Sequence, residues 1–295
     1  LKDAGISDIA IIIGGIGSNK VQEYYGNGEK FGVKITYVNQ DEPRGIAQAI
    51  GLCKEFVGND KFVVFLGDNI IKKSIINYIS KFKQSNASAS ILLCEVDNPT
   101  QFGIADVKDG MIKKIMEKPK NPPTNLAVTG IYLLTPKIFD IIDRLKPSLR
   151  NEYEITDALQ MLLDEGHKID FDMITDYWKD TGTPQDIIHA NNVILSDMTP
   201  YFDGIREKNV TIENNVMVGK GTIIKEGSVL VGPSIIGENC IIESNTYVGP
   251  NTSVGDNSKL SKCDIENSII MSGCTIEGNL KIRNSIIAFN SVIIK

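Results

Sequence analysis

The sequence predicts an α/β protein in two parts, with a mostly parallel sheet over residues 1–200 and a parallel β-helix over residues 201–295. Up to about residue 200, apolar strands alternate with amphipathic helices, which is typical of a layered sheet covered by helices. From residue 210 the pattern changes, and an aliphatic residue recurs at every sixth position. A chain of 295 residues is long enough to form two separate cores.

The first part consists of short apolar runs separated by stretches with helical spacing. Runs rich in Ile, Val and Leu that end in Gly, Asp or Asn predict strands, and apolar residues three and four positions apart predict helices. The predicted strands are 9–13, 33–38, 61–66, 88–95, 103–107 and 128–134, and the predicted helices are 18–25, 45–56, 72–85, 136–144, 155–164 and 183–196.

The second part is a repeat with a period of six residues. A fixed hexad period predicts a parallel β-helix, in which each rung stacks its aliphatic residue on the next. The register slips near residue 265, and we expect it to resume at Ile270, Ile276, Ile282, Ala288 and Ile294. The aliphatic positions are Ile212, Val218, Ile224, Leu230, Ile236, Ile242, Val248, Val254 and Leu260, and the mostly small residues four positions later are Val216, Thr222, Ser228, Ser234, Cys240, Thr246, Thr252, Ser258 and Asp264.

Composition and charge exclude several classes of protein. The formal net charge is −6, and Lys and Arg are scattered, which argues against a nucleic-acid partner because phosphate backbones require clustered cations. The five Cys form no C-x-x-C pair, which favours free thiols in a reducing cytosol. The sequence shows no basic-then-apolar leader and no apolar run near membrane-spanning length, so we expect a cytoplasmic protein without a membrane partner.

Both ends of the sequence suggest a piece of a longer chain. Residues 1–6 lack an initiator Met and resemble the last turn of a helix, so we expect an opening strand to be missing before strand 9–13. The hexads stop at Ile294-Lys295 without a polar cap. We therefore expect further residues at the carboxyl end, or a cap from a neighbouring subunit in a homo-oligomer.

The run Phe62-Val63-Val64-Phe65-Leu66 ends in Gly67-Asp68-Asn69. Continuous apolarity predicts a strand buried on both faces. Ligands bind at the carboxyl edge of such strands in open α/β sheets, so Asp68 is well placed to hold a cation against a phosphate. The alternative is that Gly, Asp and Asn are ordinary turn residues.

Three further motifs occupy loop positions. In Gln40–Ala49, Gly45 would let a flat ring approach the backbone, and the Gln40 amide can both donate and accept hydrogen bonds, as a pyrimidine edge requires. Glu117-Lys118 could bind sugar hydroxyls and a phosphate, or form a solvated charge pair. Asp180 offers a second carboxylate before a helix, or a plain helix cap.

The order and spacing of these motifs resemble the sugar-1-phosphate nucleotidyltransferases over nearly the whole chain. The resemblance is strongest to the long-form glucose-1-phosphate thymidylyltransferases, which have a Rossmann-like catalytic domain followed by a left-handed β-helix of hexapeptide repeats. The motifs are Gln-x-x-Pro-x-Gly-Ile-Ala-x-Ala at 40–49, Leu-Gly-Asp-Asn at 66–69, Phe-Gly at 102–103, Glu-Lys-Pro at 117–119, Ala-Val-Thr-Gly-Ile-Tyr at 127–132, Glu-Ile-Thr-Asp at 154–157 and Trp-Lys-Asp-Thr-Gly at 178–182.

This resemblance implies a set of site residues. Gln40 and Gly45 would bind the base of a nucleoside triphosphate, dTTP or UTP. Asp68 would contribute to binding of both the nucleotide and the metal. Asp68 and Asp180 would hold the catalytic Mg²⁺. The sugar-1-phosphate would contact Gly103, Glu117, Lys118 and Val128, with Lys118 meeting the phosphate as a catalytic residue alongside the two aspartates.

The sequence departs from the family in two respects. Phe102 stands where a Tyr is often found, so any hydroxyl contact there is lost. The Gly-x-Gly-x-x-Arg loop that binds the triphosphate in the family is absent, and Ile13-Gly14-Gly15-Ile16-Gly17 matches only the turn after the family's second strand. We therefore expect residues 1–295 alone to be inactive.

The implied reaction is attack of a sugar-1-phosphate oxygen on the α-phosphorus of the triphosphate, which gives a nucleotide-sugar and pyrophosphate. A sugar-1-phosphate is already anionic, so metal and cations are needed rather than a general base. A uridylyltransferase and a non-catalytic sugar-nucleotide-binding regulator remain alternatives. A hexapeptide acyltransferase is disfavoured because such enzymes use a coil-surface His, and residues 210–295 contain none.

Overall fold

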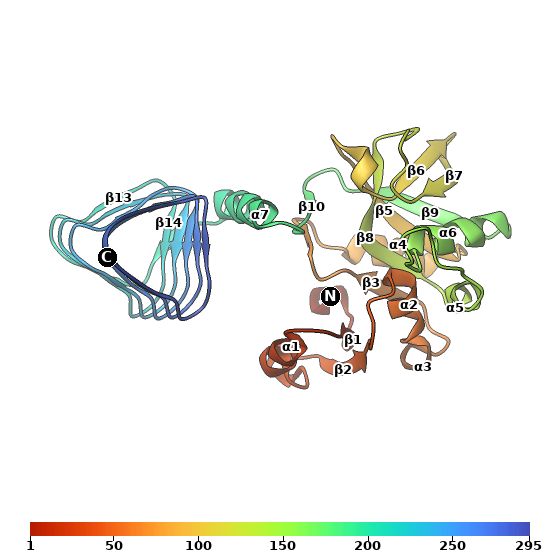
Figure 1. The fold of residues 1–295 in the computed structure, drawn as a ribbon, viewed down its shortest axis with the longest axis horizontal. Helices are drawn as coiled ribbons and strands as arrows, with labels where there is room; N and C mark the ends of the chain where they lie inside the picture. The colour runs from red at the N-terminus through yellow and green to blue at the C-terminus, as the bar shows by residue number, and fades with distance from the viewer. The chain divides into compact units, whose positions relative to one another are not determined.

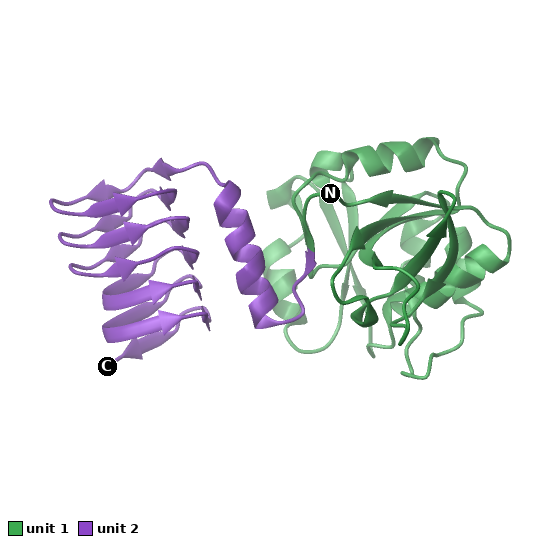
Figure 2. Ribbon diagram, turned by 90° about the horizontal axis from the view of Figure 1, so that it is seen from above, with its two compact units in different colours: residues 1–178 green, residues 179–295 purple.

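The computed structural model describes residues 1–295, and the chain divides into two compact units, residues 1–178 and 179–295 (Figure 2). The first unit is a layered α/β structure (Figure 1). The second contains helix α7 (Pro184–Asp197) and a solenoid of short strands. No helix in the chain is long and apolar enough to cross a bilayer.

The first unit contains a parallel pair and a mixed six-stranded sheet. β1 and β2 pair in parallel, and the larger sheet has the order β7-β6-β8-β5-β9 with β3 also paired to β8. The Rossmann-like α/β architecture predicted from the sequence is confirmed. The strands are β1 (Asp8–Ile13), β2 (Lys34–Asn39), β3 (Phe62–Phe65), β4 (Asn69–Ile71), β5 (Ala89–Glu95), β6 (Ile104–Lys108), β7 (Met111–Met116), β8 (Leu126–Leu134) and β9 (Ile169–Met173), with β10 (Trp178–Asp180) crossing into the second unit.

The central strand β8 runs antiparallel to β3, β5 and β6. A parallel neighbour needs a crossover connection, usually a helix. Between β5 and β8 the chain instead forms the antiparallel hairpin β6–β7. Uniform strand–helix alternation, on which the expectation of a mostly parallel sheet was based, therefore holds on either side of this hairpin but not across it.

The helices follow the predicted pattern with one interruption. The predicted helix 45–56 is divided at Leu52-Cys53 into α2 and α3, and α4 begins only after β4. Side chains of α5 and α6, including Phe139 and Leu159, pack on the sheet in the main core. The helices are α1 (Ser18–Tyr25), α2 (Ile46–Gly51), α3 (Lys54–Val57), α4 (Ile76–Gln84), α5 (Lys137–Ile142) and α6 (Ile155–Asp164), with short 3-10 turns η1 (Lys2–Ala4), η2 (Glu29–Phe31) and η3 (Pro99–Gln101).

The second unit is a parallel β-solenoid, seen nearly end-on in Figure 1 and from the side in Figure 2. Val218 pairs with Ile236, and Ile236 with Val254, so each coil spans three hexads as predicted. The aliphatic and small hexad residues from Val216 to Leu260 are buried in its core. Its strands are β11 (Tyr201–Phe202), β12 (Ile205–Arg206), β13 (Thr211–Glu213), β14 (Val216–Val218), β15 (Ile223–Ile224), β16 (Val229–Val231), β17 (Ser234–Ile236), β18 (Ile241–Ile242), β19 (Tyr247–Val248), β20 (Thr252–Val254), β21 (Lys259–Glu266), β22 (Ile269–Ile270), β23 (Thr275–Arg283), β24 (Ile286–Ile287) and β25 (Val292–Ile294).

The last coils are shorter than the sequence pattern predicts. The register shifts between Ser261 and Cys263 in β21, and from there Ile270 pairs with Ile287 and Ile276 with Ile293. The expectation that Ala288 and Ile294 continue the stack was therefore wrong, and both residues are exposed. A coil that loses a residue moves each later apolar position by one, so the hexad count no longer identifies the residues that face inward.

Asparagine occupies many corners of the solenoid in a left-handed backbone conformation. Most L-residues avoid positive φ because the Cβ atom clashes with the backbone, but Asn and Gly tolerate it. Neighbouring corners are joined where Asn267 Nδ2 donates to Asn284 Oδ1 at 2.5 Å. The corner asparagines with φ between 44° and 61° are Asn209, Asn214, Asn239, Asn245, Asn251, Asn257, Asn267, Asn284 and Asn290.

Candidate active site

Gln40 and Gly45, the two residues predicted to bind a base, line the same hollow in the first unit. The hollow has a volume of about 290 Å³ and lies at the carboxyl end of β2, where the chain turns into α2. The Gln40 N–H donates to the Ile13 carbonyl at 2.8 Å, and its Nε2 donates to Gln48 Oε1 at 2.6 Å. The lining residues are Gln40, Pro43, Gly45, Ile46, Ala49 and Glu152.

Gly45 is required by the close approach of a second segment. Its φ is +112°, and a Cβ there would lie 2.6 Å from the carbonyl oxygen of Tyr153. The same oxygen accepts a hydrogen bond from the Ala47 N–H at 3.1 Å, and the Tyr153 N–H donates to the Arg44 carbonyl at 2.7 Å. The loop at the base of the hollow is therefore held by backbone contacts that only glycine permits.

Asp68 lies in the turn between β3 and β4, and its side chain is exposed. Its neighbour Asn69 is buried and donates from Nδ2 to Asp68 Oδ1 at 2.8 Å. The Asn69 Oδ1 accepts from the Gly130 N–H at 3.0 Å and from the Trp178 indole at 2.6 Å. One amide thus joins the Leu-Gly-Asp-Asn turn to β8 and to the start of β10.

The three residues predicted to contact a sugar lie together. The Val128 N–H donates to the Gly103 carbonyl at 2.8 Å. A Cβ at Gly103 would lie 3.4 Å from Glu117 Oε2 and 2.5 Å from Thr156 Cγ2. Thr156 Oγ1 in turn donates to Glu117 Oε2 at 2.9 Å. The residue before β6, the residue after β7, strand β8 and the first turn of α6 therefore meet near the Glu117 carboxylate.

Lys118 has an unusual backbone conformation for a lysine. Its φ is +39°, and its N–H donates to the Phe102 carbonyl at 3.1 Å. Positive φ costs free energy for any residue with a Cβ, and such strain concentrates at functional sites. The strain thus falls on the lysine that the sequence singled out, beside the Glu117 cluster.

Arg150 was missed at the sequence level. Its guanidinium lies 3.1 Å from Glu117, 3.1 Å from Glu152 and 3.6 Å from the buried Glu154. Burial, with the nearby Glu117 and Glu152 charges, raises the pKa of the Glu154 carboxyl. Because Glu152 lines the hollow and Glu117 lies with Gly103 and Val128, Arg150 connects the predicted base site to the predicted sugar site. The only sequence feature that pointed to Arg150 was the neighbouring Glu-Ile-Thr-Asp motif.

Strand β8 lies beside both carboxylates, because its Gly130 contacts Asn69, the neighbour of Asp68, and its Val128 contacts Gly103, which lies against Glu117. Burial raises the pKa of the Tyr132 phenol, and the charges of Glu117 and Asp68 add to this effect. β8 carries both Tyr132 and Val128. The first unit therefore brings Asp68, Glu117 and Val128 close to one strand.

Asp180 ends β10 in the second unit and is half-buried. Its neighbour Lys179 forms an ion pair with Asp186 at 2.7 Å, where Asp186 and Thr183 cap α7. The shared metal role of Asp68 and Asp180 stays a prediction. The chain holds no cluster of three or more His, Cys, Asp and Glu side chains that could ligate a metal alone.

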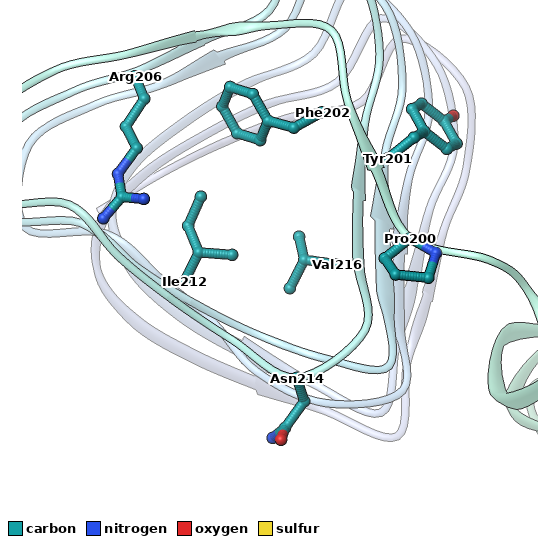
Figure 3. A pocket seen from close by; sticks show the side chains of 7 residues that line it. All are labelled: Pro200, Tyr201, Phe202, Arg206, Ile212, Asn214 and Val216. Carbon is teal, nitrogen blue, oxygen red and sulfur yellow. The ribbon is translucent and has the colours of Figure 1, made fainter.

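A larger hollow of about 420 Å³ opens at the first coil of the solenoid. Figure 3 shows Phe202, Arg206, Ile212 and Val216 pointing toward the interior of this coil. None of the predicted site residues lines it.

Comparison with protein families identifies both parts of the chain. The family model described as nucleotidyl transferase matches residues 1–197. A model described as the GMPPB C-terminal domain matches residues 230–295. The two matches correspond to the α/β part and to most of the solenoid.

Among curated proteins, the chain is 46% identical over 214 residues to the low-salt glycan biosynthesis nucleotidyltransferase Agl11 of Haloferax volcanii, covering 72% of this chain and 60% of that protein. It is 37% identical to a glucose-1-phosphate thymidylyltransferase of Streptomyces antibioticus, covering 71% and 59%. A crystal structure of a candidate glucose-1-phosphate thymidylyltransferase from Bacillus anthracis, in complex with sucrose, superposes with a TM-score of 0.62 at 42% identity, covering 68% of this chain and 81% of that chain. The matches span about three fifths of the length of these curated relatives.

Proposed function

Because the chain belongs to the nucleotidyl transferase family, we propose that the complete protein transfers a nucleotidyl group to a sugar-1-phosphate. An oxygen of the sugar phosphate attacks the α-phosphorus of the nucleoside triphosphate. The bond to the β-phosphate oxygen breaks, and pyrophosphate leaves. Glucose-1-phosphate and dTTP are the proposed substrates, since three of the curated relatives are named glucose-1-phosphate thymidylyltransferase.

The observation that carries the proposal is the convergence of Gly103, Glu117 and Val128 on one point. Gly103 precedes β6, Glu117 follows β7 and Val128 lies in β8, so the three residues come from separate parts of the chain. Glu117 offers a carboxylate that accepts from sugar hydroxyls, and the Gly103 carbonyl, already paired with Val128, fixes the spacing of the two strands. The Gln40–Gly45 hollow would take the base.

The proposed reaction requires cations near the phosphates rather than a general base. Attacking and attacked groups are both anionic, so the barrier is dominated by charge repulsion. Lys118 would meet the sugar phosphate, and its strained backbone supports a functional role. Asp68 and Asp180 carry hard oxygen donors that suit Mg²⁺, which would neutralise phosphate charge when bound.

The same site could use UTP instead of dTTP. The two bases differ by one methyl group, which contributes only about 1–3 kcal/mol in an apolar pocket. Ile46 and Ala49 supply apolar wall to the hollow. A relative named as a UTP–glucose-1-phosphate uridylyltransferase is 33% identical over 202 residues, so the uridylyl reaction is the second candidate.

We further propose that residues 1–200 act as the catalytic part, and that the coil, residues 201–295, assembles the cytoplasmic protein into a homo-oligomer. A solenoid buries its interior and offers flat outer faces, which suits assembly better than chemistry. A non-catalytic sugar-nucleotide regulator is the alternative, and it would bind the product without turnover.

The experiment is a pyrophosphate-release assay on the complete protein with Mg²⁺. Each of dTTP and UTP is combined with a panel of sugar-1-phosphates, and the sugar nucleotide is identified by mass spectrometry. We expect release to require both substrates, with glucose-1-phosphate among the best. Binding of sugar nucleotide by calorimetry without release for any pair would instead support the regulator.

A further inference from the structure

The Asn69 side chain is bonded at both ends, and its orientation is determined by its partners. The Gly130 N–H and the Trp178 indole can only donate, so the atom that they approach must be the amide oxygen. The amide nitrogen then faces Asp68 Oδ1 at 2.8 Å, which can only accept when ionised. Asn69 is 8% exposed, so water does not compete for these bonds.

β8 is shaped to receive this amide. A Cβ at Gly130 would lie 2.5 Å from Asn69 Nδ2 and 2.8 Å from both other amide heavy atoms. The Leu66 N–H also donates to the Gly130 carbonyl at 2.9 Å, so both backbone groups of Gly130 hold the turn that carries Asp68. Gly130, the glycine of the Val-Thr-Gly-Ile-Tyr motif, therefore leaves room for the side chain of Asn69.

We propose that Asn69 is a positioning residue, which fixes the direction of the Asp68 carboxylate for its metal ion. The inference rests on the proposed function, because the metal role of Asp68 is part of it. The amide cannot rotate without leaving two buried N–H groups unpaired, and an unpaired buried donor is costly. The Asp68 carboxylate, on an exposed turn, thus takes its orientation from the buried strand β8.

A purely structural role is the competing explanation, in which Asn69 only satisfies Gly130 and Trp178. The two roles differ at the metal. Hydrogen bonds to ligating carboxylates typically contribute about 10- to 100-fold to metal affinity. Loss of a buried hydrogen bond elsewhere in β8 lowers the stability of the fold but leaves the metal affinity unchanged.

The experiment compares Asn69→Leu with Thr129→Val in the complete protein. Thr129 neighbours Gly130, is fully buried, and donates to the Leu92 carbonyl at 2.9 Å, so Thr129→Val removes a buried hydrogen bond without touching Asp68. Binding of Mn²⁺, without substrate, is measured as the loss of the EPR signal of the free ion. Asp68→Asn shows which part of this binding occurs at Asp68. Melting temperature and the fluorescence of Trp178, the single Trp of the chain, are recorded in parallel.

We expect both variants to melt earlier, but only Asn69→Leu to raise the half-saturating Mn²⁺ concentration, by about tenfold or more. Its kcat should fall while the KM for sugar-1-phosphate changes little. If Asn69→Leu does not fold, Asn69→Ser replaces it with the same expectation, because a serine hydroxyl is too short to reach all three partners.

A folded Asn69 variant with wild-type Mn²⁺ affinity overturns the inference, and so does an Asp68→Asn protein that binds Mn²⁺ normally. Failure of the proposed function looks different. In that case wild-type protein binds Mn²⁺ at Asp68, and the Asn69 variant weakens this binding, but no substrate pair releases pyrophosphate. The Asn69 inference then stands without the reaction.

Discussion

The backbone of Gly45 lies against the backbone of Tyr153, so closely that a Cβ atom at position 45 would meet both the Tyr153 carbonyl oxygen, at 2.6 Å, and its nitrogen, at 2.7 Å. Tyr153 precedes α6, and Gly45 precedes α2. The contact therefore couples the start of one helix to the start of the other. Because Gln40 and Gly45 line the same hollow, its shape depends on this contact.

Gly45→Ala should lose both stability and nucleotide binding. The substitution meets backbone atoms that cannot move aside, and positive φ costs an L-residue about 1–2 kcal/mol in addition. Gly166→Ala is the matched control, because Gly166 has φ +80° with nothing within 4 Å of a new Cβ. Thermal melting and calorimetric titration with dTTP should show a larger loss of stability at position 45, and weaker binding there alone. Equal behaviour of the two variants would remove Gly45 from the base site.

Asp68→Asn and Asp180→Asn should each abolish Mg²⁺-dependent pyrophosphate release in the complete protein while leaving it folded. Losing a metal ligand removes transition-state stabilisation that is worth about 10²- to 10³-fold in rate or more. The assay is pyrophosphate release, with circular dichroism as the check on folding. Near-normal turnover in either variant would remove that residue from the metal site.

Lys118→Gly should be more stable than Lys118→Ala, although both should be nearly inactive. Glycine accepts φ +39° without strain, whereas alanine retains most of the roughly 1 kcal/mol cost. For a domain of this size that difference corresponds to about 2–4 °C in melting temperature. Differential scanning fluorimetry measures it. If alanine matches glycine, the left-handed conformation is not a strain that the lysine sustains for function.

Ile236→Asp should unfold several coils, whereas Ile241→Asp in the next strand should be tolerated. Ile236 is fully buried in the stack, whereas Ile241 is only partly buried and pairs with Lys259, whose side chain is 45% exposed, so only the first buries an unpaired charge. Nearest-neighbour coupling should spread the damage along the solenoid. Size-exclusion chromatography with light scattering and a dTTP titration on the same sample follow the consequences. Loss of oligomer with retained nucleotide binding is the expected result, and an intact oligomer would contradict the assembly role.

The fold could be predicted where the sequence period matched one simple geometry. β7 was missed because Ile112 and Ile115, both buried, are three residues apart, which is not strand spacing. The pairing explains this, since the register shifts between Asp106 and Val107 and leaves an extra residue in β7. β9 was also missed, although Ile169-Asp170-Phe171-Asp172-Met173 alternates as an edge strand should.

The motifs pointed to residues that the fold brings together, but not to the residues that hold them in place; the binding roles stay predictions. Gly103, Glu117 and Val128 meet as the motif order implied. Asn69 and Arg150 act through partners up to 109 positions away in the chain, and no spacing rule connects such residues. Sequence reasoning also could not decide whether Glu117-Lys118 was a solvated charge pair; the strained backbone of Lys118 argues against that reading.

The asparagine corners of the solenoid limit which mutations the coil can accept. At those positions Asn and Gly are interchangeable in conformational terms, while a β-branched residue would force a rung out of register. Outward-facing side chains between the corners carry no such restriction. The coil can therefore diversify its outer surface, including any surface used for assembly, while its backbone remains unchanged.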